Sequence, residues 1–171
     1  MTESNHEARE AQFNRLLAQN LPALRRLAAS YARMVSDRED LVQEIALALW
    51  RALPAFRGDC SERTFLFRIA HNRCITIYRK RRTLVPLDDV AEELADPAAT
   101  SEVALAEAQR RQQLARAVQR LPLSHREVIL LSLEGLNYEE ISAVVGISET
   151  NVGARLSRAR QQLKKLLREA S

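Results

Sequence analysis

The sequence predicts an all-α protein made of two small helical domains joined by an acidic linker. Strong helix formers dominate the composition, and glycine occurs only four times in 171 residues. Apolar residues recur at helical spacing in several segments, each bounded by capping or breaking residues. Acidic residues gather in the segment 83–109, which contains no basic residue. We therefore expect domains at residues 9–82 and 110–171, with a flexible linker at 83–109.

The first domain is expected to begin with one long helix. Residues 1–8 are polar and are expected to fray. An apolar stripe then runs from Phe13 to Met34 at the spacing of an α-helix. Pro22 lies inside this stripe and should kink or split the helix, because proline has no backbone N–H to donate.

A second helix is expected from about residue 37 to residue 53. Ser36 and Glu39 match the S-x-x-E capping box that starts many helices. Three side chains at positions i, i+3 and i+4 would share one acidic, outward face, namely Asp40, Gln43 and Glu44. An acidic face beside a basic DNA-binding region indicates a protein partner, and a merely solvated helix surface is the alternative.

A third helix is expected over residues 63–81, after a loop at 54–62. The segment from Arg63 to Arg82 contains seven basic residues and no acid, which favours contact with nucleic acid. Phe56 and Phe67 lie near this basic surface, and each ring either stacks on unpaired bases or belongs to the core. The apolar stripe expected to face the core consists of Phe65, Leu66, Ile69, Ala70 and Ile77.

Helix is expected again from about Glu102, and Leu121-Pro122 should end it. Ser124 and Glu127 repeat the S-x-x-E pattern and would cap the next helix, which Gly135 would end.

The most informative stretch follows, where only a tight turn separates two helices. Asn137 and Glu140 form a capping-box-like pair, and Gly146 ends the short first helix where a left-handed residue is required. Ser148 caps a second helix whose outer face carries six basic residues and no acid over positions 155–168. This pattern predicts a helix-turn-helix, in which the second helix suits the major groove of DNA. An ordinary helical hairpin with a solvated basic face is the alternative.

The whole-chain properties exclude several classes of protein. The formal net charge is +4 and the isoelectric point is about 9.5, which permits binding to a polyanion. The longest strongly apolar run, Ile45–Trp50, is too short to span a bilayer, and the polar N-terminus lacks a signal-peptide core. Two cysteines do not make a disulfide framework in a chain of this length, so we expect a reducing, cytoplasmic location.

We expect no enzymatic activity, metal or cofactor. The sequence has no paired carboxylates in a basic setting, no glycine-rich phosphate loop and no Ser/His/Asp constellation, which disfavours a metal-dependent nuclease. Cys60, His71 and Cys74 are spaced so that zinc binding or redox sensing is conceivable, but a fourth ligand is missing. Small buried thiols are the more common interpretation of such cysteines.

Four motifs, in this order along the chain, resemble those of one family. Residues 37–44 (DREDLVQE), Phe56-Arg-Gly and residues 65–72 (FLFRIAHN) are similar to region 2 of the extracytoplasmic-function (ECF) sigma factors, which are minimal specificity subunits of bacterial RNA polymerase. The resemblance to region 4 of that family is carried by Leu121-Pro122, Arg126-Glu-Val, Tyr138-Glu-Glu-Ile and residues 155–160 (RLSRAR).

The resemblance implies three interactions. The basic coiled coil of the polymerase largest subunit would bind Asp40, Leu41, Gln43 and Glu44. A flipped base and the phosphates of the promoter −10 element would be held by Phe56, Asp59, Arg63, Phe67, Arg68, Asn72, Arg73 and Arg79, with the loop 59–63 as the base pocket. The −35 element would be read as duplex by Ser148, Thr150, Asn151, Arg155, Ser157 and Arg158.

The resemblance also implies an anti-sigma partner, and it implies that the acidic linker follows polymerase channels built for nucleic acid; a plain soluble tether is the alternative for the linker. Gly153 and Ala154 depart from the family pattern, which has basic or polar residues there, and they remove reach toward the groove. The main rival function is a stand-alone two-domain helix-turn-helix regulator, which would have no use for the acidic face of the second helix.

Overall fold

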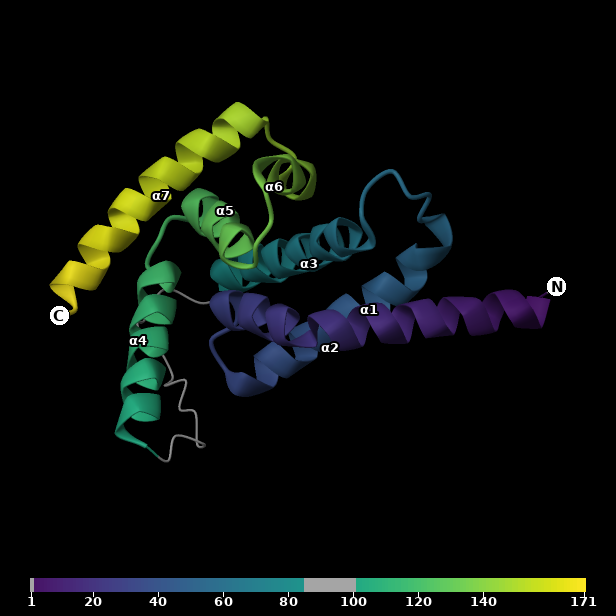
Figure 1. Ribbon diagram of the computed structural model, residues 1–171, viewed down its shortest axis with the longest axis horizontal. Helices are drawn as coiled ribbons and strands as arrows, with labels where there is room; N and C mark the ends of the chain where they lie inside the picture. Colours follow the sequence, from purple (N-terminus) through teal and green to yellow (C-terminus); the bar gives the residue numbers. More distant parts are fainter. Residues whose placement is uncertain (1, 85–100) are drawn as a thin grey trace. The chain divides into compact units, whose positions relative to one another are not determined.

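The computed structural model describes residues 2–84 and 101–171, and every regular element in this part of the chain is a helix (Figure 1). The chain divides into two compact units. The first contains α1 (Thr2–Tyr31), α2 (Val35–Ala52), a short 3₁₀ helix η1 (Leu53–Ala55) and α3 (Glu62–Leu84). The second contains α4 (Glu102–Gln119), α5 (Leu123–Leu133) and α7 (Glu149–Glu169), with α6 (Tyr138–Val145) linking α5 to α7 along the chain. The expected all-α fold is confirmed, whereas most of the expected linker lies outside the described residues.

In the first unit, α1, α2 and α3 each pack against the other two. Their shared core consists of fully buried side chains, which include Leu24, Leu27, Leu41, Ile45, Leu49, Leu66 and Phe67. Burial of this many large apolar groups supplies the main driving force for folding the unit.

Helix α1 differs from the expectation at two places. It begins at Thr2 instead of fraying through residue 8, because its first turns are held against α2. The guanidinium of Arg9 lies 4.3 Å from the ring centre of Trp50, and Phe13 meets the same ring edge-on at 5.4 Å. Pro22 lies inside the helix without splitting it. Leu24 and Leu27 are buried just beyond it, and this packing offsets the missing hydrogen bond.

The predicted capping box at the start of α2 is wrong. The helix begins at Val35, and no side chain caps its first turn, so Ser36 already lies inside the helix. The corner between α1 and α2 is held instead by Arg38, whose guanidinium donates hydrogen bonds to the carbonyls of Ala32 and Arg33 at 3.2 and 3.1 Å.

Helix α3 begins with a cap that the sequence analysis did not identify. The hydroxyl oxygen of Ser61 accepts a hydrogen bond from the backbone N–H of Thr64 at 3.0 Å. The next residue, Glu62, accepts hydrogen bonds from Gln12 at 2.7 Å and from Arg15 at 2.9 Å. These bonds from α1 lower the pKa of Glu62, the bond from Arg15 contributing most. The start of α3 is thus fixed against α1.

In the second unit, the predicted cap at Ser124 is also wrong. Helix α5 starts at Leu123, directly after Pro122, and no side chain caps it. The position that matters is Arg126, which is 7% exposed. Its guanidinium donates hydrogen bonds to the carbonyls of Gln119 and Leu121, which end α4, so this arginine joins the end of α4 to the start of α5.

The turn between α6 and α7 confirms the predicted helix-turn-helix. The amide oxygen of Asn137 accepts from the N–H of Glu140 at 2.9 Å, and the carboxylate of Glu140 accepts from the N–H of Asn137 at 2.7 Å. Gly146 has φ +79°, a conformation that favours glycine, and the Ser148 hydroxyl accepts from the N–H of Asn151 at 3.2 Å.

Candidate polymerase and DNA interfaces

Helix α2 presents the predicted acidic face. Asp40, Gln43 and Glu44 are exposed, whereas Leu41 is only 1% exposed and belongs to the core of the first unit. Leu41 therefore cannot make the apolar contact assigned to it while the unit is folded. Leu47 is 46% exposed and follows Gln43 and Glu44 by four and three residues, so it lies on the same face. This face combines exposed acids with an exposed apolar side chain.

The core stripe of α3 is displaced from the predicted one. Leu66 and Ala70 are buried as expected, but Phe67 is also fully buried. Its predicted role in stacking on bases is therefore wrong, and the Arg63 guanidinium covers its ring at 4.8 Å. Phe65 is instead only half-buried and packs on Phe56, with ring centres 4.7 Å apart. The aromatic pair at the loop is thus Phe56–Phe65.

The outward face of α3 carries the predicted basic and polar groups. Asn72, Arg73 and Arg79 are exposed, and Arg68 lies one turn before Asn72. The loop before α3 turns at Gly58, which has φ +79°, and exposes Asp59. Loop and helix together form a surface of unpaired donors beside two half-buried rings, which suits single-stranded nucleic acid.

His71 and Cys74 face the core of the first unit. Burial lowers the pKa of His71 from 6.5 to about 4, with a smaller contribution from the charge of Arg79, so the ring is neutral at pH 7. Burial raises the pKa of the Cys74 thiol far above its ordinary range, which keeps it protonated. Within the described residues, which include Cys60, no group of three or more candidate ligands could hold a metal ion. Packing is the role that this geometry supports for both side chains.

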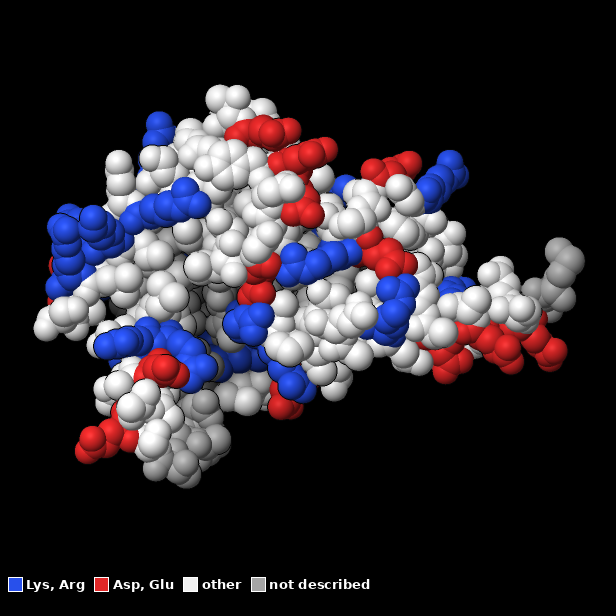
Figure 2. All heavy atoms as spheres, viewed as in Figure 1, with Lys and Arg blue, Asp and Glu red and all other residues white. Residues whose placement is uncertain are grey.

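Helix α7 separates an apolar face from a basic one. Val152, Leu156, Ala159 and Leu163 are buried. Lysine and arginine side chains gather toward its C-terminal half, as Figure 2 shows. Of the predicted base-reading residues, five are exposed, namely Ser148, Thr150, Asn151, Ser157 and Arg158.

Two neighbours of α7 were not identified from the sequence. Glu127 of α5 is 8% exposed, and its carboxylate oxygen lies 3.9 Å from a guanidinium nitrogen of Arg155, which is half-buried. Tyr138 of α6 lies against Gly153, where a Cβ atom would come within 3.3 Å of the tyrosine ring. Gly153 thus leaves space for this ring at the α6–α7 contact.

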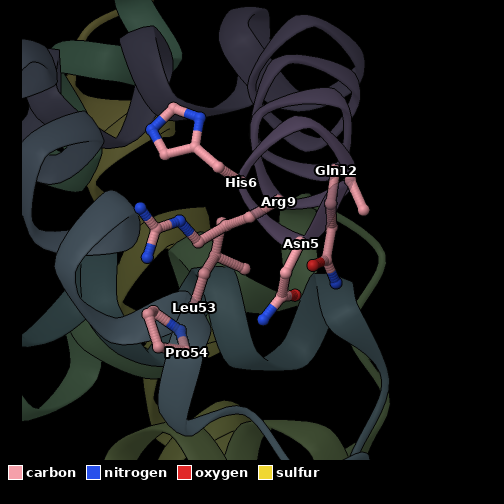
Figure 3. Close-up of a pocket in the computed structure, with 7 residues that line it drawn as sticks. Asn5, His6, Arg9, Gln12, Leu53 and Pro54 are labelled. Carbon is pink, nitrogen blue, oxygen red and sulfur yellow. The ribbon is translucent and has the colours of Figure 1, made fainter. Parts of the chain in front are cut away.

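A pocket of about 430 Å³ lies between the start of α1 and η1 (Figure 3). Its lining contains neither an acid nor a thiol, so it offers no acid–base pair or nucleophile. The residues that line it are Asn5, His6, Ala8, Arg9, Gln12, Leu53 and Pro54. Within the described part of the chain, no helix is long and apolar enough to cross a membrane.

Two protein-family models match the two units. The model for Sigma-70 region 2 matches residues 16–83, and the model for Sigma-70, region 4 matches residues 111–163. The ECF RNA polymerase sigma factor SigM of Mycobacterium tuberculosis is 31% identical to this chain over 158 residues, which cover 91% of this chain and 76% of SigM. The chain belongs to the ECF RNA polymerase sigma factors.

Other members of the ECF sigma factor family show the same relationship. The RNA polymerase sigma factor CnrH of Cupriavidus metallidurans is 35% identical, covering 91% of this chain and 86% of CnrH. A solved structure of CnrH in complex with the cytosolic domain of CnrY has a TM-score of 0.70 and 31% identity, and covers 95% of this chain and 91% of that one. The sigma factor RpoE of Bartonella quintana, in complex with the anti-sigma factor NepR, has a TM-score of 0.73 and 28% identity, and covers 92% of this chain and 97% of that one. This chain is therefore a transcription initiation factor of RNA polymerase, a class of non-enzymatic proteins.

Proposed function

We propose that this ECF sigma factor uses three separate surfaces to bind core polymerase, to open the −10 element and to read the −35 element. The main support is the distribution of charge within the first unit. Helix α2 exposes Asp40 and Glu44, whereas α3 exposes Arg73 and Arg79. A regulator that only binds duplex DNA has no use for the acidic surface, but a subunit that joins polymerase to promoter DNA needs both.

The acidic face of α2 is the proposed polymerase-binding surface. Asp40, Gln43 and Glu44 would meet the basic coiled coil of the largest subunit, and Leu47 would supply the apolar contact in place of the buried Leu41. An exposed apolar side chain ringed by polar groups is the usual composition of a small protein interface.

The loop before α3 and the outward face of that helix form the proposed −10 surface. Unstacking a base costs a few kcal/mol, which contacts to the flipped base and to phosphates must offset. The Phe56–Phe65 pair offers ring surface, Asp59 lies in the loop, and Asn72 and Arg73 are exposed donors one helix turn after Arg68.

Helix α7 is the proposed −35 reader. Its N-terminal half carries Thr150 and Asn151, whose short polar side chains can reach base edges or phosphates. Arg158 can contact phosphates, which position the helix on the duplex without specifying sequence.

An anti-sigma protein is the proposed additional partner. Two related sigma factors have been solved with CnrY and with the anti-sigma factor NepR. In this chain, Met34 and Val35 are 54% and 53% exposed at the α1–α2 corner, and Leu47 is exposed on α2. A partner that covers these side chains would remove apolar surface from water. Polymerase and its sigma factors act in the cytoplasm, which is the location we propose.

In-vitro transcription tests the whole proposal. The purified chain is mixed with core polymerase and a promoter library, and transcripts are compared with those of core polymerase alone. We expect initiation that depends on the chain, at promoters sharing two spaced elements. Tight binding of the chain alone to duplex DNA, without any initiation, would instead favour the stand-alone regulator.

Charge reversal on α2 tests the polymerase surface specifically. Glu44→Lys should weaken binding to core polymerase by about tenfold at moderate salt, because it replaces an attraction by a repulsion. Glu7→Lys makes the same charge change at an exposed position of α1 and is the matched control. Equal losses in the two variants would show that net charge, and not this face, determines binding.

A further inference from the structure

The middle of the proposed recognition surface on α7 has little reach toward DNA. Gly153 has no side chain and lies against Tyr138, and Ala154 is exposed but apolar. The next residue with hydrogen-bonding groups, Arg155, therefore becomes the candidate for base contact at this level of the helix.

The Arg155 side chain is held at one end and open at the other. One guanidinium nitrogen lies 3.9 Å from the Glu127 carboxylate, which is an ion-pair distance and too long for a hydrogen bond. Its side chain is 31% exposed, and its N–H groups make no hydrogen bond to any described residue. By contrast, Arg15 and Arg126 already donate hydrogen bonds within the protein. The donors of Arg155 remain available for an external acceptor.

Glu127 is well placed to set the direction of that guanidinium. Its side chain is only 10% exposed, and a buried carboxylate is costly unless a cation or donors compensate it. It belongs to α5, which a second link also ties to α7, since His125 Nδ1 and Gln162 Oε1 are 2.8 Å apart. The position of the carboxylate relative to α7 is therefore well defined.

We propose that Glu127 is a positioning residue, which orients the Arg155 guanidinium for bidentate contact with a guanine of the −35 element. Arginine donates in parallel to O6 and N7 of guanine in the major groove, and this contact discriminates against the other bases only if the guanidinium plane is held. The proposal rests on the −35 function of α7 proposed above. It adds that a residue of α5, distant from the bases, determines selectivity at one promoter position.

The test measures base preference position by position in the −35 element. Holoenzyme assembled with wild-type or variant chain selects promoters from a library randomised over this element, and bound sequences are counted. Arg155→Ala should abolish a guanine preference at one position, which in wild type is about tenfold. Glu127→Gln should reduce the preference at that same position by severalfold and leave the other positions unchanged. The double variant should match Arg155→Ala.

The design separates positioning from a purely structural role. Loss of binding at all sequences alike in Glu127→Gln, or an additional loss in the double variant, would overturn the proposal. Glu127→Asp keeps the charge with a shorter reach, and serves if the glutamine variant does not fold; it should lower the same single preference. Wild-type holoenzyme that shows no −35 preference at all would refute the proposed function itself, which is a different outcome.

Discussion

At the residue scale, His71 couples the stability of the first unit to pH. It is 5% exposed, and its Nδ1 atom is buried without a hydrogen-bond partner. Its pKa is about 4 in the folded chain and 6.5 in the ordinary state, so between these values the unfolded chain binds a proton that the folded chain does not. Folding free energy from this group is therefore lost as the pH falls from about 7 to 4, by about 3 kcal/mol in total.

We predict that His71→Leu reduces this loss. Leucine has a similar volume and does not titrate, so the variant should gain stability relative to wild type by about 3 kcal/mol between pH 7 and pH 4. Trp50 is the only tryptophan and lies in the first unit, so its fluorescence during urea unfolding reports on this unit. His6→Gln, at an exposed position, should keep the wild-type pH dependence. A wild-type dependence in His71→Leu would refute the role of this residue.

Single residues also show where sequence patterns are ambiguous. Successive helix positions are about 100° apart, so two adjacent apolar residues can both border the core. The pattern admitted Phe67 as either a stacking ring or a core ring, and only the packing of α1 and α2 against α3 decides for the core. For the same reason, Leu41 looked available to a partner although it closes the core. The polar sites Asp40, Gln43 and Asn72 were predictable, because a charged or amide side chain is rarely buried without partners.

At the element scale, the four helix starts that the sequence analysis assigned to a polar cap had two outcomes. The caps at Asn137 and Ser148 formed as predicted, whereas Ser36 and Ser124 lie inside helices whose starts have no side-chain cap. Asn137 and Ser148 flank the short helix that Gly146 ends, so little other structure can fix these starts. The starts of α2 and α5 are defined by tertiary contacts, including those of Arg38 and Arg126, which no local pattern encodes.

This contrast predicts different costs for two serine substitutions. Ser148→Ala removes the acceptor for the Asn151 N–H and should destabilise the second unit by about 1 kcal/mol. Ser124→Ala removes no cap and should change stability by less than about 0.5 kcal/mol. Urea unfolding followed by circular dichroism measures both, and Trp50 fluorescence should stay unchanged because that ring lies in the first unit. Equal costs would contradict the assignment of the caps.

At the scale of the whole molecule, the order of charged segments was the most reliable guide to function. The basic stretch of α3, the acids that follow it and the basic face of α7 come from the sequence alone, and the two matching family regions coincide with the two basic segments. The expected linker spans residues 83–109, of which α3 includes the first two and α4 begins at Glu102. The remaining acids lie outside the described residues. Their effect on DNA binding is therefore predicted from charge and tethering alone.

We predict that the linker acids weaken DNA binding by the free chain. Carboxylates tethered near the basic face of α7 are present at high effective concentration and compete with phosphates for the same cations. Neutralising three of them (Glu92→Gln, Glu93→Gln and Asp96→Asn) should tighten binding of the full chain to −35 duplex by about threefold to tenfold at low salt. High salt should remove most of the difference. The control neutralises Glu3, Glu7 and Glu10 of α1, which changes the net charge equally. If the control tightens binding as much, net charge explains the effect and the linker has no specific role.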